Sequence, residues 1–309
     1  MRIAPTRYVK STGQVAWDTL RTFVSDGCPA MAASLSFYTI FSLPPLLAIL
    51  MLIVGSFLDP PTLRDLLSTQ VGTLLGPRGG EQVIALVENA GRPDISSLAA
   101  SLGILALIFG ATTAFANLQG ALNTAWNVAP NPRRGDIRNF LLKRVISLAM
   151  VVAIGFLLLV SLAVSAALAG FGQAINYLLP AGLSAGVLRA LDFSVSFVVI
   201  GLLFTLLFCY VPDAIVRWRD ALVGGALTAL LFILGKGAIG LYIGRSDPGS
   251  VYGAAGSLAV ALLWLYYNAI ILFLGAEFTQ VWATRRGAPI IPEHGAVRIV
   301  HKVEPINQR

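Results

Sequence analysis

The sequence predicts an all-α membrane protein, a polytopic bundle of six transmembrane helices. Its 309 residues are 56% hydrophobic and only 12% charged, whereas an average soluble domain carries about 25% charged residues. A helix that crosses a bilayer needs about 20 mostly apolar residues, because the hydrocarbon layer is about 30 Å thick. Six stretches of the chain meet this requirement, so a water-soluble globular protein is excluded.

The six stretches are separated by charged or Gly/Pro-rich connections. They cover residues 33–58, 95–118, 145–170, 191–211, 221–243 and 253–282. The first contains Pro44 and Pro45, which remove backbone donors and predict a kink with unpaired carbonyls one turn earlier. We expect one transmembrane domain over residues 29–283, a cytoplasmic segment over residues 1–28 and a flexible cytoplasmic tail over residues 284–309.

The longest outer connection, residues 59–94, contains two short amphipathic stretches around a Gly/Pro-rich break at residues 76–80. Two interpretations are equally compatible with this pattern. The stretches are helices that lie on the outer leaflet or cap a cavity, or they form a packed connector, since amphipathicity does not distinguish lipid from protein as the covering partner.

The basic residues predict the orientation of the chain. Sixteen Lys and Arg residues fall on the side of the N-terminus and five on the opposite side. Because Lys and Arg favour cytoplasmic loops, we expect both termini on the cytoplasmic side of a bacterial inner membrane. Trp126, Trp218 and Trp282 fall at the same predicted boundary, where the indole ring is favoured. This placement accounts for the net charge of +7 without a nucleic-acid partner.

Three charged residues fall inside predicted spans, and each is a candidate functional group because charge in a membrane is costly. They are Asp192, Lys236 and Glu277. Depth predicts that Asp192 pairs with Lys236, and that Glu277, near the cytoplasmic boundary, pairs with Arg217 or Arg219. A structural clamp formed by Asp192 and Lys236, with Glu277 as an interfacial anchor, is one interpretation of these charges. A proton-coupled carboxylate and a contact to a lipid head group are the alternatives.

A polar row marks the inner end of the second span. Gln119, Asn123 and Asn127 recur every fourth residue and therefore share one helical face, with Asn117 nearby. The row predicts either hydrogen bonds between helices or the lining of a cytoplasm-facing cavity. With Ser36, Tyr38 and the proline pair of the first span, it defines a candidate substrate path.

The fifth stretch is rich in small residues that let helices approach closely. Its glycines are Gly224, Gly225, Gly235, Gly237, Gly240 and Gly244. They predict tight packing, or sliding between two states of a transporter.

Signatures of catalysis and of metal or cofactor binding are missing from the sequence. The two histidines, His294 and His301, both lie in the tail, and the spacing of His, Cys and acidic residues suits no metal. We therefore expect no catalytic residues, no cofactor and no enzymatic activity.

Several motifs between about residues 27 and 283 resemble, in order and spacing, the YihY/BrkB family of bacterial inner-membrane proteins, once mislabelled as a ribonuclease. They are Ala33-Ser34-Leu35-Ser36-Phe37-Tyr38, Leu43-Pro44-Pro45, residues 117–126, Val211-Pro212-Asp213, Arg217-Trp218-Arg219-Asp220, Tyr252-Gly253-Ala254-Ala255-Gly256, Trp264-Leu265-Tyr266 and Gly275-Ala276-Glu277. The resemblance implies six helices and an envelope role linked to virulence and lipid handling, but no established site residues. Lys236 has no counterpart in the pattern.

Three functions follow as hypotheses from different classes. The first is a transporter or flippase-like handler of lipids or other amphiphiles, with membrane lipids as partners. The alternative is a non-transporting scaffold that docks envelope-assembly proteins. A ribonuclease is the least supported, because the chain offers no cluster of acidic metal ligands.

Overall fold

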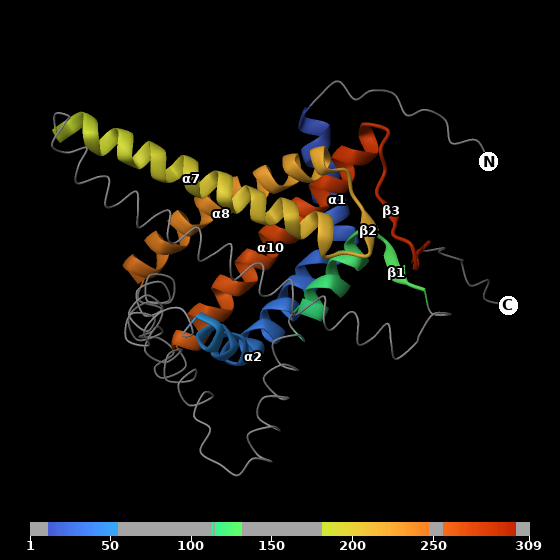
Figure 1. Cartoon of the computed structure of the whole chain (residues 1–309), viewed down its shortest axis with the longest axis horizontal. Coiled ribbons are helices and arrows are strands. Elements are labelled where there is room, and N and C mark those ends of the chain that lie inside the picture. Colours follow the sequence, from blue (N-terminus) through green and yellow to red (C-terminus); the bar gives the residue numbers. More distant parts are fainter. Residues whose placement is uncertain (1–11, 55–112, 114, 132–180, 247–255, 301–309) are drawn as a thin grey trace, which may run out of the picture.

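The computed structural model describes residues 12–54, 113, 115–131, 181–246 and 256–300 (Figure 1). Long helices dominate these residues. They are α1 (Thr12–Ser25), α2 (Cys28–Val54), α7 (Ala181–Tyr210), α8 (Trp218–Ser246) and α10 (Gly256–Arg285), together with helical residues 115–125. The chain is therefore a mostly helical protein.

Three of the described helices are long and apolar enough to cross a membrane. The candidate spans are Phe193–Tyr210, Trp218–Ala238 and Leu258–Arg285. They correspond to the fourth, fifth and sixth predicted stretches, although α7 begins about ten residues before the prediction. The third stretch and the outer loop of residues 59–94 lie outside the described residues, as does most of the second stretch, so the count of six spans stays a prediction.

Helix α10 occupies the middle of the described bundle, packing against α1, α2 and α8, while α7 packs against α8 (Figure 1). Helices α1 and α2 are joined by Gly27, whose φ of 70° is the left-handed conformation that glycine adopts without strain. Helix α2 is continuous from Cys28 to Val54 and includes both prolines. The side chains of Pro44 and Pro45 lie outside the described residues.

Glycine and threonine form the seam between α7, α8 and α10. Each helix carries a Gly-x-x-x-Thr motif in which the buried threonine donates a hydrogen bond of 2.7 Å to the carbonyl of its own glycine. The three motifs are Gly201–Thr205, Gly224–Thr228 and Gly275–Thr279. Threonine satisfies its hydroxyl within its helix this way, so the seam is closely packed without an unpaired polar group on these threonines.

The fit of the seam excludes side chains at its glycines. A Cβ atom on Gly224 would lie 1.8 Å from Oγ1 of Thr279, and one on Gly275 would lie 1.8 Å from Oγ1 of Thr228. A Cβ on Gly225 would lie 2.6 Å from the carbonyl oxygen of Gly201. Close packing, one of the two interpretations of the small residues in the fifth stretch, is therefore confirmed for Gly224 and Gly225.

Segments far apart in sequence gather at one end of the bundle, which we call the basic end. They are α1, residues 115–131, the α7–α8 connection, the end of α10 and residues 286–300 (Figure 1). Two small antiparallel sheets join them: β1 (Val128–Pro130) with β4 (Ala296–Arg298), and β2 (Ala214–Ile215) with β3 (Ile291–Pro292). The charge count had assigned these same segments to one side of the membrane.

The structure differs from two expectations at the basic end. The expected flexible tail forms β3 and β4, and Ile290 is buried, because the β1 and β2 segments offer backbone partners at this end. Trp126 is no interfacial anchor: it is 1% exposed, donates from Nε1 to the carbonyl of Ala276 at 3.0 Å and packs beside Phe208. Its indole N–H thus finds a partner on α10 instead of water.

Candidate functional site

Glu277 is the most unusual group in the described part of the chain. It lies within the candidate span Leu258–Arg285, and its side chain is 0% exposed. Its Oε1 accepts a hydrogen bond from Sγ of Cys28 at 3.4 Å, and its Oε2 has no hydrogen-bond partner. A buried carboxylate without full pairing is costly, so this position is a candidate functional site.

The surroundings of Glu277 are polar but contain no cation among the described residues. Thr22 lies beside the carboxylate, and Asp26 is close enough to repel it. The prediction that Glu277 pairs with Arg217 or Arg219 is wrong, because both arginines are exposed and the contacts of Glu277 come from the α1–α2 corner. Sequence depth placed the carboxylate near the boundary but could not show that α1 covers it.

Cys28 begins α2, five residues before the predicted apolar span, and is fully buried against Glu277. Burial raises the pKa of the Cys28 thiol far above its ordinary value, and the neighbouring carboxylates of Glu277 and Asp26 raise it further. The thiol therefore stays protonated and acts as a hydrogen-bond donor to Glu277.

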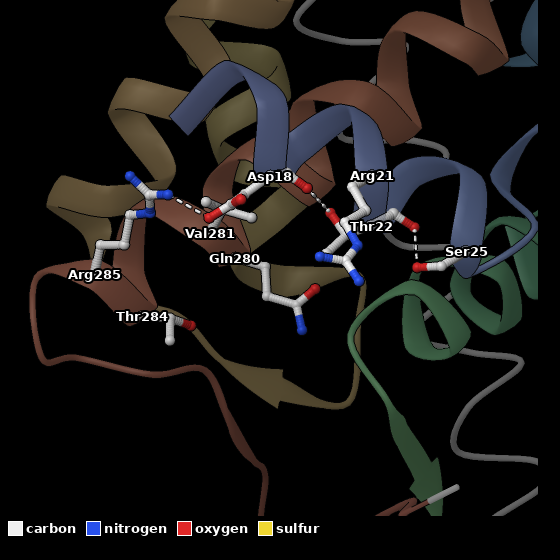
Figure 2. A pocket seen from close by; sticks show the side chains of 8 residues that line it. All are labelled: Asp18, Arg21, Thr22, Ser25, Gln280, Val281, Thr284 and Arg285. Carbon is white, nitrogen blue, oxygen red and sulfur yellow. Dashed lines mark hydrogen bonds and ion pairs between the residues drawn. The ribbon is translucent and has the colours of Figure 1, made fainter. Parts of the chain in front are cut away.

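A cleft of about 430 Å³ opens beside this buried pair, between α1 and the last turns of α10 (Figure 2). Thr22 belongs both to the wall of the cleft and to the surroundings of Glu277. The residues that line the cleft are Asp18, Arg21, Thr22, Ser25, Gln280, Val281, Thr284 and Arg285. We call it the α1–α10 cleft.

An ion pair closes one side of the α1–α10 cleft. Arg285 pairs through Nη2 with Oδ2 of Asp18 and also donates to the carbonyl of Gln14 at 2.9 Å. Figure 2 shows this pair joining the two helices. Arg285 Nη1 and Gln280 Oε1 are buried without a hydrogen-bond partner. Two residues that line the cleft therefore each carry a buried polar atom without a partner, one a donor and one an acceptor.

Gln119 and Asn123 of the predicted polar row form a second cluster with Asp213. Gln119 Nε2 donates to Oδ1 of Asp213 at 3.2 Å, and Asn123 Nδ2 donates to Oδ2 at 2.8 Å. Asn123 Oδ1 accepts from the backbone N–H of Asp213 at 2.8 Å. The amides thus hold the α7–α8 connection, which supports hydrogen bonding between segments as their role.

An open hollow of about 240 Å³ borders this cluster, so the cavity interpretation keeps some support. Gln119, Asn123 and Asp213 line it together with Pro130 and Ile299. Asn117 instead donates within its own helix to the carbonyl of Thr113. Asn127 has a φ of 54°, and its carbonyl accepts from Ile299, so it shapes the turn into β1.

The remaining candidate path residues on α2 do not join one path. Ser36 is buried and donates to the carbonyl of Ala33, whereas Tyr38 is exposed and packs edge-on against Phe37. Exposure of Phe37, Tyr38 and Phe41 places an aromatic face on the outside of α2. The single path predicted from the sequence is therefore divided between separate surfaces.

The Asp192–Lys236 pair stays a prediction, because the Asp192 side chain lies outside the described residues. The backbone register is compatible with it: Gly201 of α7 lies against Ala226 and Ala229 of α8. Since the two helices run antiparallel, residues 192 and 236 fall at the same level. Lys236 itself is exposed.

Two parts of the polar sites were missed by sequence reasoning, one at the α1–α10 cleft and one at the Gln119–Asn123 cluster. No helix was predicted within the cytoplasmic segment of residues 1–28, although Val15, Thr19 and Phe23 follow the helical spacing of α1. Asp213 was recognised only as a family motif. In the part of the chain that the structure describes, no three His, Cys, Asp or Glu residues cluster as metal ligands.

Comparison with known proteins shows a match over nearly the whole chain. The family model described as Virulence factor BrkB matches residues 19–299. A UPF0761 membrane protein of Pseudomonas aeruginosa (strain LESB58) is 29% identical over 298 residues, covering 93% of this chain and 68% of the relative. One from Alkalilimnicola ehrlichii is 32% identical over 270 residues, covering 85% of this chain and 56% of the relative.

A similar protein of Rhodospirillum centenum is 30% identical over 320 aligned positions and is also named a UPF0761 membrane protein. The alignment covers all of this chain and 67% of that relative. The chain thus spans between 56% and 68% of the length of these three relatives. No solved structure matches the chain.

Proposed function

Since the chain belongs to the Virulence factor BrkB family of membrane proteins, we propose that it is a flippase-like transporter that moves lipids or other amphiphiles in the bacterial inner membrane. Envelope biogenesis is the process in which such movement is needed. The proposal includes no enzymatic activity and no cofactor. Its partners are membrane lipids.

Glu277 carries the proposal. The carboxylate is fully buried in a candidate span, lacks a partner at Oε2 and lies beside the polar α1–α10 cleft. Ionisable residues at such positions in membrane proteins mark substrate pathways and proton relays. We assign Glu277 the role of the group that changes partner or protonation when α1 moves away from α10.

The orientation is part of the same proposal. The charge count assigned sixteen basic residues to one side of the membrane and five to the other. Six of the sixteen are described by the structure and lie at the basic end: Arg21, Arg217, Arg219, Arg285, Arg286 and Arg298. The bias of Lys and Arg toward the cytoplasm then supports a cytoplasmic basic end, with the cleft opening near the inner leaflet. Substrate would enter from that leaflet.

A vesicle assay tests the proposal. The protein is reconstituted in vesicles of phosphatidylethanolamine and phosphatidylglycerol that carry a fluorescent phospholipid, and dithionite bleaches the lipid in the outer leaflet. We expect bleaching beyond the outer leaflet with wild type and at least a tenfold slower rate with Glu277→Gln, which keeps the shape and removes the charge. Glu293→Gln, an exposed carboxylate at the same end, is the matched control.

Two outcomes would contradict the proposal. Wild type that moves no labelled lipid faster than protein-free vesicles would favour the scaffold alternative, in which the basic end docks envelope-assembly proteins. Equal rates for Glu277→Gln and Glu293→Gln would separate Glu277 from transport. Size-exclusion chromatography establishes beforehand that both variants are folded.

A further inference from the structure

Helix α1 has three faces. One face packs against the bundle through Thr19 and Phe23, which are 4% and 8% exposed. A second face is apolar and uncovered: Trp17, Leu20 and Val24 are 69%, 50% and 69% exposed. Their spacing of three and four residues places them in one row along the helix. We call this row the α1 stripe.

The α1 stripe lies beside one end of a candidate membrane span. Arg285, the last residue of the candidate span Leu258–Arg285, bonds to Gln14 and Asp18 of α1. Helix α1 therefore runs beside the end of this candidate span, which the proposed orientation places at the cytoplasmic interface. An amphipathic helix with Trp and Leu on one face and Arg on another is typical of the membrane interface, where its apolar face enters the acyl chains.

The third face connects the α1 stripe to the α1–α10 cleft. Arg21 lies four residues after Trp17 and three before Val24, so around the helix it borders the stripe. Arg21 also lines the cleft, where Arg285 contributes a second guanidinium (Figure 2). A ligand that touches both surfaces must combine an apolar body with a group that guanidinium recognises.

The cleft chemistry fits a phosphate ester. Guanidinium groups bind phosphate oxygens through paired, charge-assisted hydrogen bonds. Arg285 Nη1 and Gln280 Oε1 are buried and unpaired, so a small shift of α1 would offer the ligand a donor for its phosphate and an acceptor for a hydroxyl or ammonium group. Asp18 balances one of the two arginines, which leaves one positive charge for one phosphodiester.

We propose that the α1–α10 cleft binds the phosphodiester head group of a glycerophospholipid from the inner leaflet, with the acyl chains along the α1 stripe. The inference rests on the proposed function, to which it adds the class of lipid and the place where it is held. Arg21 and Arg285 bind the phosphate, and Gln280 accepts a hydrogen bond from the polar end of the head group.

Trp17 provides a direct probe, because bromine on an acyl chain quenches a nearby indole. Phosphatidylglycerol with brominated chains is titrated into detergent-purified protein, and the signal of Trp17→Phe is subtracted from that of wild type. We expect saturable quenching of Trp17 at a low mole fraction of lipid. Arg21→Gln should raise the half-saturating fraction at least fivefold, and Arg219→Gln, an exposed arginine at the same end, should not.

Two further ligands distinguish a lipid head group from a soluble phosphate ester as the occupant of the cleft. Brominated diacylglycerol, which lacks the phosphate, should quench only in proportion to its concentration. Soluble sn-glycerol 3-phosphate at millimolar concentration should not displace the lipid. Saturable quenching by diacylglycerol equal to that by phosphatidylglycerol would overturn the head-group site, and full displacement by glycerol phosphate would assign the cleft to a soluble ester.

A second variant protects the test against misfolding. Ser25→Phe, at an exposed residue that lines the cleft, fills the space without removing a charge and should weaken saturable binding as Arg21→Gln does. If both variants fold and bind like wild type, the site is wrong. Saturable binding without lipid movement in vesicles would contradict the proposed transport function but support the lipid site in the cleft. Lipid movement without saturable binding would support transport but contradict the lipid site.

Discussion

Helix α10 forms two different kinds of interface, one with α8 and one with α1 and α2. Toward α8, Gly275 and Thr279 form a seam in which the threonine hydroxyls are bonded within their own helices. Toward α1 and α2, the same stretch presents Glu277 and Gln280, whose Oε2 and Oε1 atoms lack partners. The interface with α8 is closely packed and leaves no threonine hydroxyl unpaired. The interface with α1 and α2 retains unpaired polar atoms, to which a ligand or a shifted helix can hydrogen-bond.

The difference between these two interfaces of α10 indicates which helices can move and where a ligand can bind. A close-packed seam transmits force but has no room to rearrange. An interface with unpaired buried groups gains free energy when it finds partners, because each unpaired group costs about 1–3 kcal/mol. We therefore assign the rigid role to α7, α8 and the α8 side of α10, and the changing role to α1.

The largest expected effect comes from adding one carbon to the seam. Gly225→Ala would place a Cβ atom 2.6 Å from the Gly201 carbonyl oxygen and 2.9 Å from the Thr205 nitrogen. Both are backbone atoms, so relief requires that α7 and α8 separate, at a cost of about 1–3 kcal/mol or more. We expect a large loss of monodisperse protein on size exclusion in detergent.

Gly237→Ala is the matched control on the same helix, since nothing lies within 4 Å of its Cβ position. Alanine favours a helix over glycine by about 0.5–1 kcal/mol, so this variant should be as stable as wild type or slightly more so. If both variants behave alike, the seam is not rigid and the comparison of the two interfaces fails.

The sequence predicted much of the seam and little of the cleft. Length and hydropathy located the three described spans, since those signals belong to each helix alone. The row of Gln119 and Asn123 was expected to bond between segments, and it does, but its partner Asp213 lies 90 residues away from Asn123. Only the fold brings these residues together.

The cleft was missed for a related reason. It depends on α1 folding back over α10 across the single turn at Gly27. The first 28 residues contain no apolar run long enough to suggest a span, so hydropathy gave them no structure. Glu277 was identified as costly from its position alone, but its covering partners, Cys28 and Thr22, lie about 250 residues earlier.

A moderate effect is expected at the cluster of Gln119, Asn123 and Asp213, which carries a charge as the cleft does but whose Asn123 amide is bonded through both Oδ1 and Nδ2. Asn123→Ala removes the donor to Asp213 Oδ2 and the acceptor of the Asp213 backbone N–H. Hydrogen bonds to charged groups contribute about 1.5–3 kcal/mol each. The melting temperature in detergent should therefore fall clearly.

Asn117→Ala is the control for this change, because Asn117 donates within its own helix to the Thr113 carbonyl. Its melting temperature should stay near that of wild type. A fall as large as that of Asn123→Ala would mean that polarity of the row, and not its bonding to the α7–α8 connection, stabilises this end of the molecule.

The smallest effect is expected when the Asp18–Arg285 ion pair is removed. The rate at which the Cys28 thiol reacts with maleimide measures this effect. In a Cys209→Ala background, Cys28 should react slowly with maleimide near neutral pH, since the thiolate is the reactive form and burial beside Glu277 raises its pKa. The rate should increase as the pH rises, because a larger fraction of thiol then loses its proton.

Asp18→Asn removes the ion pair that holds α1 on α10. A partly exposed pair contributes about 0.2–1 kcal/mol, so the population with α1 displaced should grow by no more than about fivefold. The maleimide rate should grow by the same factor, while Glu293→Gln, which removes an exposed carboxylate elsewhere at the basic end, should leave it unchanged. An unchanged rate with Asp18→Asn would mean that α1 is held by its buried face, through Thr19 and Phe23, and that the interface on this side of α10 is as fixed as the seam on the other.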